Sequence, residues 1–349
     1  MKSAITIVTG TMLLIACAGE PENPIDPPII ETAEEQAANM LLDRAQTLFE
    51  PLSADANNPD NPITAEKVAL GKMLYYDNNL SKDRTQSCNT CHNLATYGVD
   101  NRPTSPGDNG GFGERNSPTV LNAALHFAQF WDGRMTDVEE QAGGPITNPV
   151  EMAIPSQEFL EDRLRTMEVY QAKFAEAFPG EDEPITYWNV QQAIAAFERT
   201  LLTPSKWDNY LAGDATALNE EEQLGLKLFI DNNCIMCHSG ENLGGHMYQK
   251  FGLLEKYWEH TGSEKIDNGR MAATGNEADQ YIFKVPSLRN IEKTHPYFHD
   301  GSVEDLNEAI RIMAKVQFKK DLSDDEVKHI RAFLNALTGE VPPSALPDA

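Results

Sequence analysis

The chain has 349 residues, which is enough for two domains of ordinary size, and 40% of them are apolar, so it can form packed cores. Its formal net charge of −26 argues against nucleic acid as a partner, because phosphates repel so acidic a surface. Such a surface attracts small basic proteins, although the commoner role of surface charge is solubility alone.

Residues 1–16 are predicted to form an export signal of the lipoprotein type. Lys2 supplies the positive start, residues 5–15 form an apolar run, and the tetrapeptide LIAC resembles a cleavage site at which Cys17 is lipidated. The run is shorter than the about 20 apolar residues that cross a bilayer. The alternative is an ordinary signal peptide with an incidental cysteine. Residues 17–40 are expected to form a flexible tether.

The other four cysteines form two pairs with the same spacing, each followed at once by a histidine: Cys88, Cys91 and His92, then Cys234, Cys237 and His238. This is the attachment motif of c-type haem, in which two thiols bond to the porphyrin and the next imidazole becomes the proximal iron ligand. Disulfides or zinc sites are the alternatives for cysteines in an exported protein. Two complete motifs favour two covalent haems.

An internal repeat surrounds the two haem sites. Residues 66–74 (EKVALGKML) match residues 221–229 (EEQLGLKLF), and residues 117–122 (SPTVLN) match residues 285–290 (VPSLRN). The same distance after each final Asn comes an aromatic corner, FWDG in the first copy and FHDG in the second. The repeat predicts a duplicated haem-binding unit.

Apolar residues recur at helical spacing in residues 157–178 and 188–202. A further helix is predicted over residues 324–338, with Ser323 as its N-cap. Because no long alternating pattern indicates strands, the expected fold is mainly α with long loops.

The predicted architecture is two cytochrome c-type domains in tandem, each binding one covalent haem. The N-terminal domain is expected over residues 41–205 and the C-terminal domain over residues 206–340, with a tail at 341–349. The first would carry the peroxide-binding haem if its iron has an open side, and the second would carry a haem for electron transfer.

The two copies differ where a sixth iron ligand is expected. After its FHDG corner the second copy carries Met313, whose thioether can ligate iron and raise the haem potential. After its FWDG corner the first copy carries Glu151, and a carboxylate beside an open haem can exchange protons with peroxide. Spacing alone leaves a surface carboxylate and a core methionine as alternatives.

The sequence resembles the bacterial di-haem cytochrome c peroxidases over almost the whole chain, from about residue 40 to residue 340. The matching stretches are residues 87–100 (SCNTCHNLATYGVD), 116–133 (NSPTVLNAALHFAQFWDG), 148–152 (NPVEM), 288–290 (LRN) and 296–301 (PYFHDG). The resemblance implies an oxidoreductase that reduces hydrogen peroxide to water with electrons from a small cytochrome c or cupredoxin.

The same resemblance implies iron ligands. His92 would be the proximal ligand of a low-potential, peroxidatic haem, while His238 and Met313 would ligate a high-potential haem that stores an electron. In relatives that oxidise a protein-bound amino acid, a tyrosine takes the place of the thioether ligand. Met313 therefore favours the peroxidase branch over the protein-oxidising branch.

The resemblance also implies residues for catalysis and for a calcium ion. Glu151 and Gln141 would line the peroxide pocket, with Glu151 as the acid and base. Trp131 would lie between the haems as a candidate electron relay, although a core aromatic at a turn is its alternative.

One Ca²⁺ between the domains would be held by Asn116 and by backbone oxygens of Thr294 and Pro296, since Ca²⁺ prefers oxygen ligands. Homodimers occur among proteins of this type. His299, after the second aromatic corner, is expected to support the second haem or the contact between domains.

One position departs from the family pattern. Many members carry a histidine in the loop after the first haem site that ligates the peroxidatic iron at rest, and Asp108 stands there in this chain. His126 is the nearby histidine and an alternative iron ligand, since His binds metals readily, although it lies on a stretch where the family has no ligand. We predict that the first iron keeps an open position even when fully oxidised, so that the enzyme needs no reductive activation.

Function is therefore expected to be peroxide reduction in the periplasm or at the cell envelope, with a lipid anchor as the membrane attachment. The first alternative is a di-haem electron carrier without catalysis, which would need a sixth ligand on both irons. A protein-modifying di-haem oxidase and a haem-free protein with disulfides or zinc are further alternatives.

Overall fold

The computed structural model describes residues 32–347. The predicted signal peptide, Cys17 and the first part of the predicted tether lie outside these residues. The described chain is mostly helical, which confirms the predicted mainly α class. Among residues 32–347, no helix combines the length and the apolar character needed to cross a membrane.

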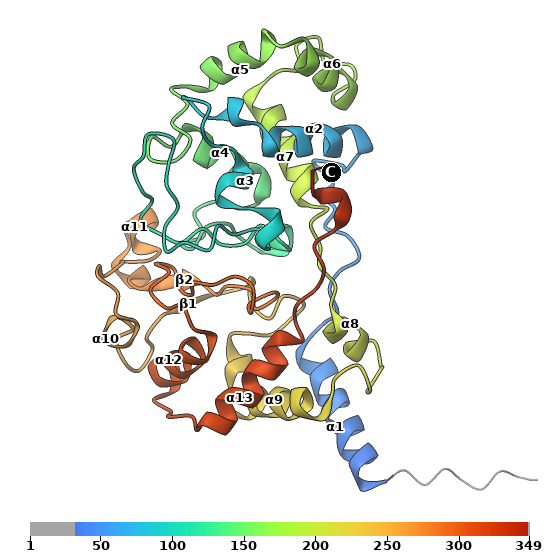
Figure 1. Cartoon of the computed structure of the whole chain (residues 1–349), viewed down its shortest axis with the longest axis vertical. Coiled ribbons are helices and arrows are strands. Elements are labelled where there is room, and N and C mark those ends of the chain that lie inside the picture. The colour runs from blue at the N-terminus through green and yellow to red at the C-terminus, as the bar shows by residue number, and fades with distance from the viewer. Residues whose placement is uncertain (1–31, 348–349) are drawn as a thin grey trace, which may run out of the picture.

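The upper half of the molecule in Figure 1 holds one group of helices. These are α2 (Ala65–Tyr76), α3 (Cys88–Cys91), α4 (Val138–Thr147), α5 (Gln157–Arg165), α6 (Glu168–Ala177) and α7 (Tyr187–Glu198). Its largest core cluster joins α2, α6 and α7 through fully buried side chains such as Leu70, Phe174 and Val190.

The lower half holds the remaining helices and a small antiparallel sheet. They are α1 (Ala33–Leu48), α8 (Lys206–Leu211), α9 (Glu220–Asp231), α10 (Trp258–Thr261), α11 (Met271–Thr274), α12 (Leu306–Phe318), α13 (Asp324–Asn335), β1 (Tyr248–Lys250) and β2 (Ile282–Lys284). Short 3₁₀ turns complete the two halves: η1 (Asn78–Leu80), η2 (Leu94–Thr96), η3 (Ala123–Leu125), η4 (Cys234–Met236), η5 (Glu277–Asp279) and η6 (Pro343–Ala345).

The predicted helices are present, but one of them is divided into two. The segment 157–178 is broken at Thr166 and Met167 into α5 and α6, so it forms two helices. Ser323 does cap α13: its hydroxyl accepts from the amide of Glu326, whose carboxylate accepts from the amide of Ser323.

The repeat is visible in the packing of two helix pairs. Gly71 of α2 lies against α7, where an added Cβ would be 1.9 Å from the carbonyl oxygen of Ala193. Gly225 of α9 lies in the same way against α13, where an added Cβ would be 1.9 Å from the carbonyl oxygen of His329. Gly71 and Gly225 are therefore equivalent, which shifts the sequence match by one residue, so that Glu66 pairs with Glu220.

The N-terminal segment belongs to the lower half. Leu42, Ala45 and Phe49 are buried with Trp207 and other lower-half side chains, and the ring of Phe49 meets that of Trp207 edge-on at 5.2 Å. This differs from the expected tether through residue 40 and from the expected start of the upper domain at 41, since α1 already begins at Ala33. The reason is the apolar side of α1, which packs into the core cluster of the lower half.

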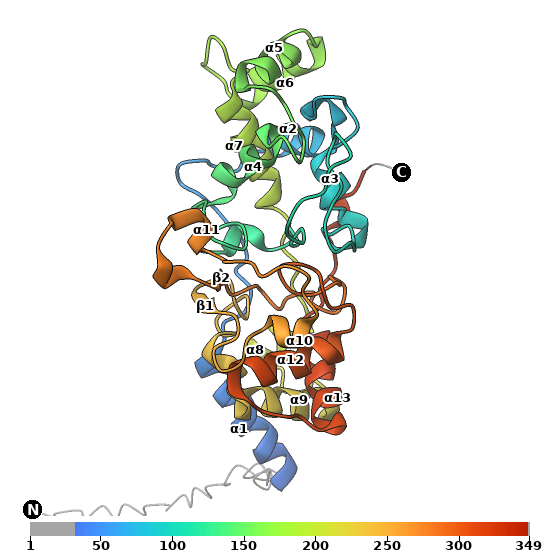
Figure 2. The same cartoon turned by 90° about the vertical axis from the view of Figure 1, so that its left-hand side faces the viewer.

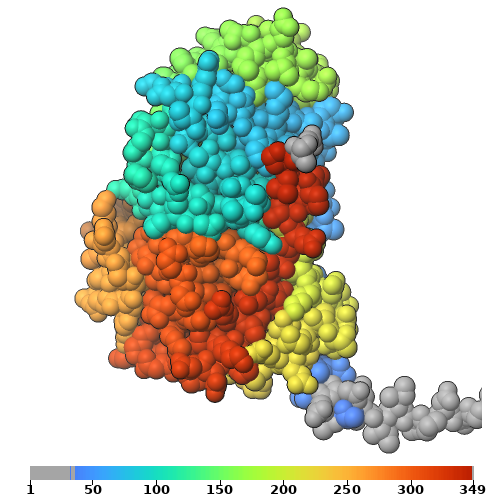
Figure 3. Space-filling model, viewed as in Figure 1, coloured from blue at the N-terminus to red at the C-terminus, as the bar shows by residue number. Residues whose placement is uncertain are grey.

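The C-terminal segment returns to the upper half, where it is red in Figures 1 and 3. Ala345 and Leu346 pack with Tyr75 of α2, and Lys72 donates hydrogen bonds to the carbonyls of Ser344 (2.8 Å) and Leu346 (2.6 Å). Residues 341–347, expected as a tail, are thus a packed part of the upper half.

Loops that carry the two aromatic corners meet where the halves join, as the two views in Figures 1 and 2 show. The amide of Asn116 donates to the carbonyl of His299 (2.7 Å), and the amide of Lys284 donates to the carbonyl of Trp131 (2.8 Å). Backbone hydrogen bonds of this kind fix the two halves in one register at their boundary.

Candidate active site

The first Cys-x-x-Cys-His motif opens onto a cavity of about 1210 Å³, which we call the first cavity. Cys88 and Cys91 are the first and last residues of the one-turn helix α3, and His92 follows it directly. A capping box between Ser87 and Thr90 begins this short helix. All three motif side chains line the cavity.

These residues fit a covalent c-type haem. The thiols of Cys88 and Cys91 are unpaired, and Nδ1 of His92 is buried without a hydrogen-bond partner. Burial lowers the pKa of His92 more than nearby backbone groups raise it, so the imidazole is neutral, as an iron ligand must be. Two free thiols and a neutral imidazole are the donor set that the motif predicts.

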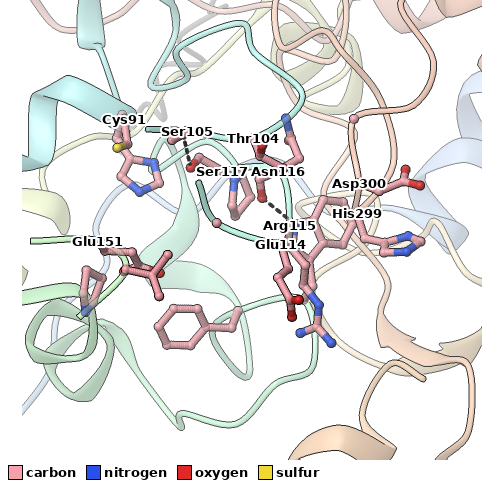
Figure 4. Close-up of a pocket in the computed structure, with 18 of the residues that line it drawn as sticks. Cys91, Thr104, Ser105, Glu114, Arg115, Asn116, Ser117, Glu151, His299 and Asp300 are labelled. Atoms are coloured by element: carbon pink, nitrogen blue, oxygen red, sulfur yellow. Dashed lines mark hydrogen bonds between the residues drawn. The ribbon is translucent and has the colours of Figure 1, made fainter. Parts of the chain in front are cut away.

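Glu151 and Gln141 line the same cavity as the haem motif. Gln141 lies on α4, and Glu151 lies in the turn that follows this helix, where its amide donates to the carbonyl of Asn148 (3.0 Å). Burial raises the pKa of Glu151, and the charge of Arg134 and a hydrogen bond with Asn148 offset part of this. Figure 4 shows Glu151 and Cys91 on one side of the cavity and His299 on the other.

The second motif lines a cavity of about 240 Å³ in the lower half, the second cavity. Cys234, Cys237, His238 and Met313 all contribute to its wall. Nδ1 of His238 lies 2.9 Å from the carbonyl oxygen of Leu243, which leaves Nε2 as the nitrogen free to bind iron. Burial lowers the pKa of His238 to about 4, so this imidazole is also neutral.

Trp131 lies between the two cavities and lines both. Its indole Nε1 donates to the carbonyl of Asn116 (2.9 Å), and its ring meets that of His299 edge-on at 6.4 Å. His299 also lines both cavities and is only 2% exposed. These two aromatic side chains are therefore part of the wall that the two cavities share, together with other residues such as Phe130.

Comparison with known proteins agrees with this donor set. Residues 65–216 match the family described as Di-haem cytochrome c peroxidase. Cytochrome c551 peroxidase of Nitrosomonas europaea is 46% identical over 84% of this chain and 87% of its own, and that of Pseudomonas aeruginosa is 44% identical over 87% and 88%. The chain belongs to the di-haem cytochrome c peroxidase family.

A solved structure agrees with the fold. The crystal structure of a MauG-like protein associated with microbial copper homeostasis matches 83% of this chain and 93% of its own, with a TM-score of 0.71 and 29% identity. The predicted family and enzyme class, a cytochrome c peroxidase, are confirmed. Membership in a di-haem family implies two haems.

In this di-haem peroxidase, Asp108 lines neither of the two cavities, and its side chain holds its loop in place. Its carboxylate accepts hydrogen bonds from the amide of Asp83 (2.6 Å) and from the amide and hydroxyl of Thr85 (3.2 and 2.7 Å). The amide of Asp108 donates to the carbonyl of Glu151 (2.7 Å), and Gly107 packs so closely on Val150 that a Cβ would lie 1.8 Å from its carbonyl oxygen. The glycine-rich loop is therefore tied to the segment that carries Glu151.

His126 lines the second cavity and not the first. Its Nδ1 lies 2.9 Å from the ammonium of Lys284. The prediction left open that His126 ligates the first iron. Its position shows that it does not face that site.

Glu198 is a residue of the first cavity that the sequence did not single out. It ends α7, is 4% exposed, and its carboxylate has no hydrogen-bond partner among the described residues. Burial and, to a smaller extent, the charge of Glu139 raise its pKa to about 8, against the opposing charge of Arg199. The signal in the sequence is a carboxylate inside the apolar run AIAAFE, where a helix face is expected to be buried.

The residues expected to hold calcium come together at the wall of the second cavity. Asn116, Thr294 and Pro296 all line it. The side-chain amide of Asn116 donates to the carbonyl of Arg102 (2.9 Å), while its side-chain oxygen accepts no hydrogen bond among the described residues. That oxygen is available to a cation.

Two alternatives from the sequence lose support. The four cysteines of the described chain, Cys88, Cys91, Cys234 and Cys237, are all unpaired, so they form no disulfides. Within residues 32–347, no group of three or more His, Cys, Asp or Glu side chains is arranged to hold a metal ion such as zinc.

Proposed function

We propose that this peroxidase reduces hydrogen peroxide to water in the first cavity, taking up two protons and two electrons for each peroxide. The observation that supports this most directly is that Glu151, with its raised pKa, lines the same cavity as His92. A haem held by Cys88, Cys91 and His92 would supply the iron that accepts electrons from the second site and the Lewis acidity that weakens the O–O bond.

Glu151 is the proton carrier in this proposal. In its ionised form the carboxylate takes the proton from one peroxide oxygen, and it returns that proton to the other oxygen, which leaves as water. The amide of Gln141, on the preceding helix, orients the peroxide by hydrogen bonding. Partial burial excludes bulk water and raises the pKa of Glu151 above its ordinary value, which makes the carboxylate a better proton acceptor.

Electrons would be stored at the second site and passed across the wall between the cavities. His238 and Met313 line the second cavity and would ligate its haem, and Trp131 lies between the two sites. A small cytochrome c or cupredoxin would supply the electrons. The name of the two bacterial relatives, cytochrome c551 peroxidase, supports a cytochrome as the donor.

We also propose that the first iron stays open in the oxidised protein. Asp108, which occupies the place of the family's resting ligand, is bonded to Asp83 and Thr85. Apart from His92, the histidine that lines the first cavity is His299, and it lies at the wall shared with the second cavity. This arrangement supports catalysis over the alternative of a simple electron carrier.

The proposal also covers the domains, the location of the protein and the calcium ion. Each half of the molecule would be one haem domain, exchanging its terminal segments with the other half. The protein would be exported, lipidated at Cys17 and held at the periplasmic side of the cell envelope. One Ca²⁺ would bind Asn116 and the backbone oxygens of Thr294 and Pro296, next to the wall that carries Trp131.

The test is the variant Glu151→Gln in the holoprotein, which keeps the shape of the side chain and removes its proton exchange. We expect the turnover number for peroxide to fall by about 10²–10⁴-fold, while the absorbance spectrum and the content of two haems stay unchanged. Glu158→Gln, at an exposed carboxylate on α5, is the matched control and should keep full activity. Full activity in Glu151→Gln would contradict the proposed role.

A further inference from the structure

The second cavity gathers cations although the chain is strongly acidic. Lys284 and Lys320 line it, and among the described residues no Asp or Glu does. The whole chain has 54 acidic residues against 28 basic ones, so a wall without acids is unusual for this protein. A positive cavity of this kind is suited to an anionic group.

Lys284 is the buried one of the two lysines. It is the last residue of β2, is 7% exposed, and its backbone amide is bonded to Trp131 at the wall between the cavities. Its ammonium has one hydrogen bond among the described residues, to Nδ1 of His126 at 2.9 Å. Burial lowers the pKa of Lys284 to about 8, and no carboxylate offsets this. A buried ammonium without an anion is costly, so the cavity lacks a partner for it.

His126 holds this ammonium in position. Burial and the charge of Lys284 keep the pKa of His126 well below its ordinary value, so the ring is neutral and its Nδ1 accepts the hydrogen bond. Gly245 packs directly on the ring, since a Cβ there would lie 2.4 Å from Cδ2 of His126. This contact packs the imidazole on one side, and the other N–H donors of Lys284 are left for a ligand in the cavity.

Lys320 has a different environment. It is exposed, its ammonium bonds to the side chain of Asn232, and it is close enough to Cys234 to lower the pKa of that thiol against the effect of burial. Lys320 thus lies at the edge of the cavity where the thioether bonds would form. Lys284 lies elsewhere on the cavity wall, where its backbone amide donates to the carbonyl of Trp131. A c-type haem in this cavity would bring two propionate carboxylates, and Lys284 is the buried lysine among the described residues that line it.

We propose that Lys284, held in position by His126, binds an anion and forms a salt bridge with a propionate carboxylate of the second haem. The inference rests on haem attachment at Cys234 and Cys237, as proposed above. A cation beside the porphyrin favours the reduced iron, because reduction removes one positive charge. Lys284 would therefore help to keep the second haem at high potential, next to the residue proposed to relay its electrons.

The experiment compares the holoprotein variants Lys284→Met and Lys320→Met, which remove the same charge from the same cavity. The midpoint potential of the second haem, followed by its visible spectrum during electrochemical titration, should fall clearly in Lys284→Met. It should change little in Lys320→Met, whose charge is screened by water, and Lys284→Arg should stay close to the wild type. Equal potentials in Lys284→Met and Lys320→Met would overturn the proposal.

A second measurement uses the wild type and does not depend on the folding of a variant. A salt-bridged propionate stays ionised, so the potential of the second haem should be constant from about pH 5 to 7, where an unpaired haem carboxylate would titrate. Among the other titratable groups at this cavity, burial raises the pKa of Tyr297 to about 12 and lowers the pKa of His299 below its ordinary value. A wild-type potential that already rises on acidification through this range would also overturn the proposal.

Failure of haem binding at the second site and failure of the proposed role of Lys284 give different results. Loss of the second covalent haem from the wild-type protein, measured by mass and by absorbance, would remove the site itself. Two intact haems with an unchanged potential in Lys284→Met would leave the peroxidase function standing and would remove only the role of Lys284.

Discussion

Asn122 and Asn290, which end the matching segments of the two repeats, both donate a hydrogen bond of 2.8 Å to the hydroxyl of Thr203. Both have left-handed backbone conformations, with φ of 60° and 61°. The side-chain oxygens accept from the amides of Thr203 (2.9 Å) and Gly339 (3.0 Å), respectively. The two copies are thus joined at one buried threonine between the halves.

Thr203→Val should lower the thermal stability of the whole protein. The variant leaves two buried amide groups without an acceptor, which costs roughly 1–3 kcal/mol for each. Differential scanning calorimetry measures the change in the unfolding midpoint. Thr166→Val is the control, because the hydroxyl of Thr166 is exposed and bonds only to a nearby carbonyl. A Thr203→Val midpoint equal to that of the control would show that the shared hydroxyl is unimportant.

Gly71→Ala and Gly225→Ala should be strongly destabilising and equivalent to each other. In both cases the new Cβ would meet a backbone carbonyl oxygen at 1.9 Å, which forces two packed helices apart at a cost of about 3 kcal/mol, the upper end of the usual range for overpacking. Gly113→Ala is the control, because the nearest atom to its added Cβ lies at 3.8 Å. Yields of folded holoprotein and thermal midpoints would measure the effect, and a tolerated Gly71→Ala would contradict the helix packing described here.

The helical class, the haem motifs and the repeat could be predicted because they are local patterns. Ser323 capping α13 is such a case. The placement of α1 in the lower half could not be predicted, since it depends on packing against Trp207, which is far away along the chain. The predicted register of the repeat was wrong by one residue. It followed the similarity of residue types, whereas the contact that the two copies share is the close approach of Gly71 to α7 and of Gly225 to α13.

In the candidate site, the residues that could be predicted are those that match the motifs of the family. Glu151 and Gln141 do line one cavity with the first haem motif. The anchoring role of Asp108 depends on its bonds to Asp83 and Thr85, which sequence spacing does not reveal. Glu198 was missed because its burial depends on how α7 packs against the rest of the upper half.

Arg134→Leu should move the acid limb of peroxidase activity to higher pH. The charge of Arg134 lowers the pKa of Glu151, so its removal raises that pKa, and the proton-accepting carboxylate is lost earlier on acidification. The pH profile of the turnover number tests this. Arg134→Lys keeps the positive charge and should keep the wild-type profile. A shift toward lower pH in Arg134→Leu would have the wrong sign for the account.

Glu198→Gln should make the stability of the protein less dependent on pH. The pKa of Glu198 is raised to about 8 in the folded state, so the folded protein holds a proton that the unfolded chain releases between that pH and the ordinary value of 4.5. Wild-type stability therefore falls, relative to the variant, as pH rises through this window, and the difference levels off above it.

Thermal midpoints of the wild type and Glu198→Gln across this window measure the effect. Glu176→Gln, at an exposed carboxylate on α6, is the control and should follow the wild type. Parallel curves for the wild type and Glu198→Gln would mean that Glu198 is ionised in the folded protein throughout.

The central claim, an open first iron with peroxide chemistry at Glu151, is tested most directly by electron paramagnetic resonance and visible spectra of the fully oxidised holoprotein. Peroxide is then added without any reductant. We predict a high-spin ferric signal beside a low-spin signal from the His238 and Met313 site, and rapid loss of the high-spin species on adding peroxide. Two low-spin haems that ignore peroxide until the second haem is reduced would contradict the account.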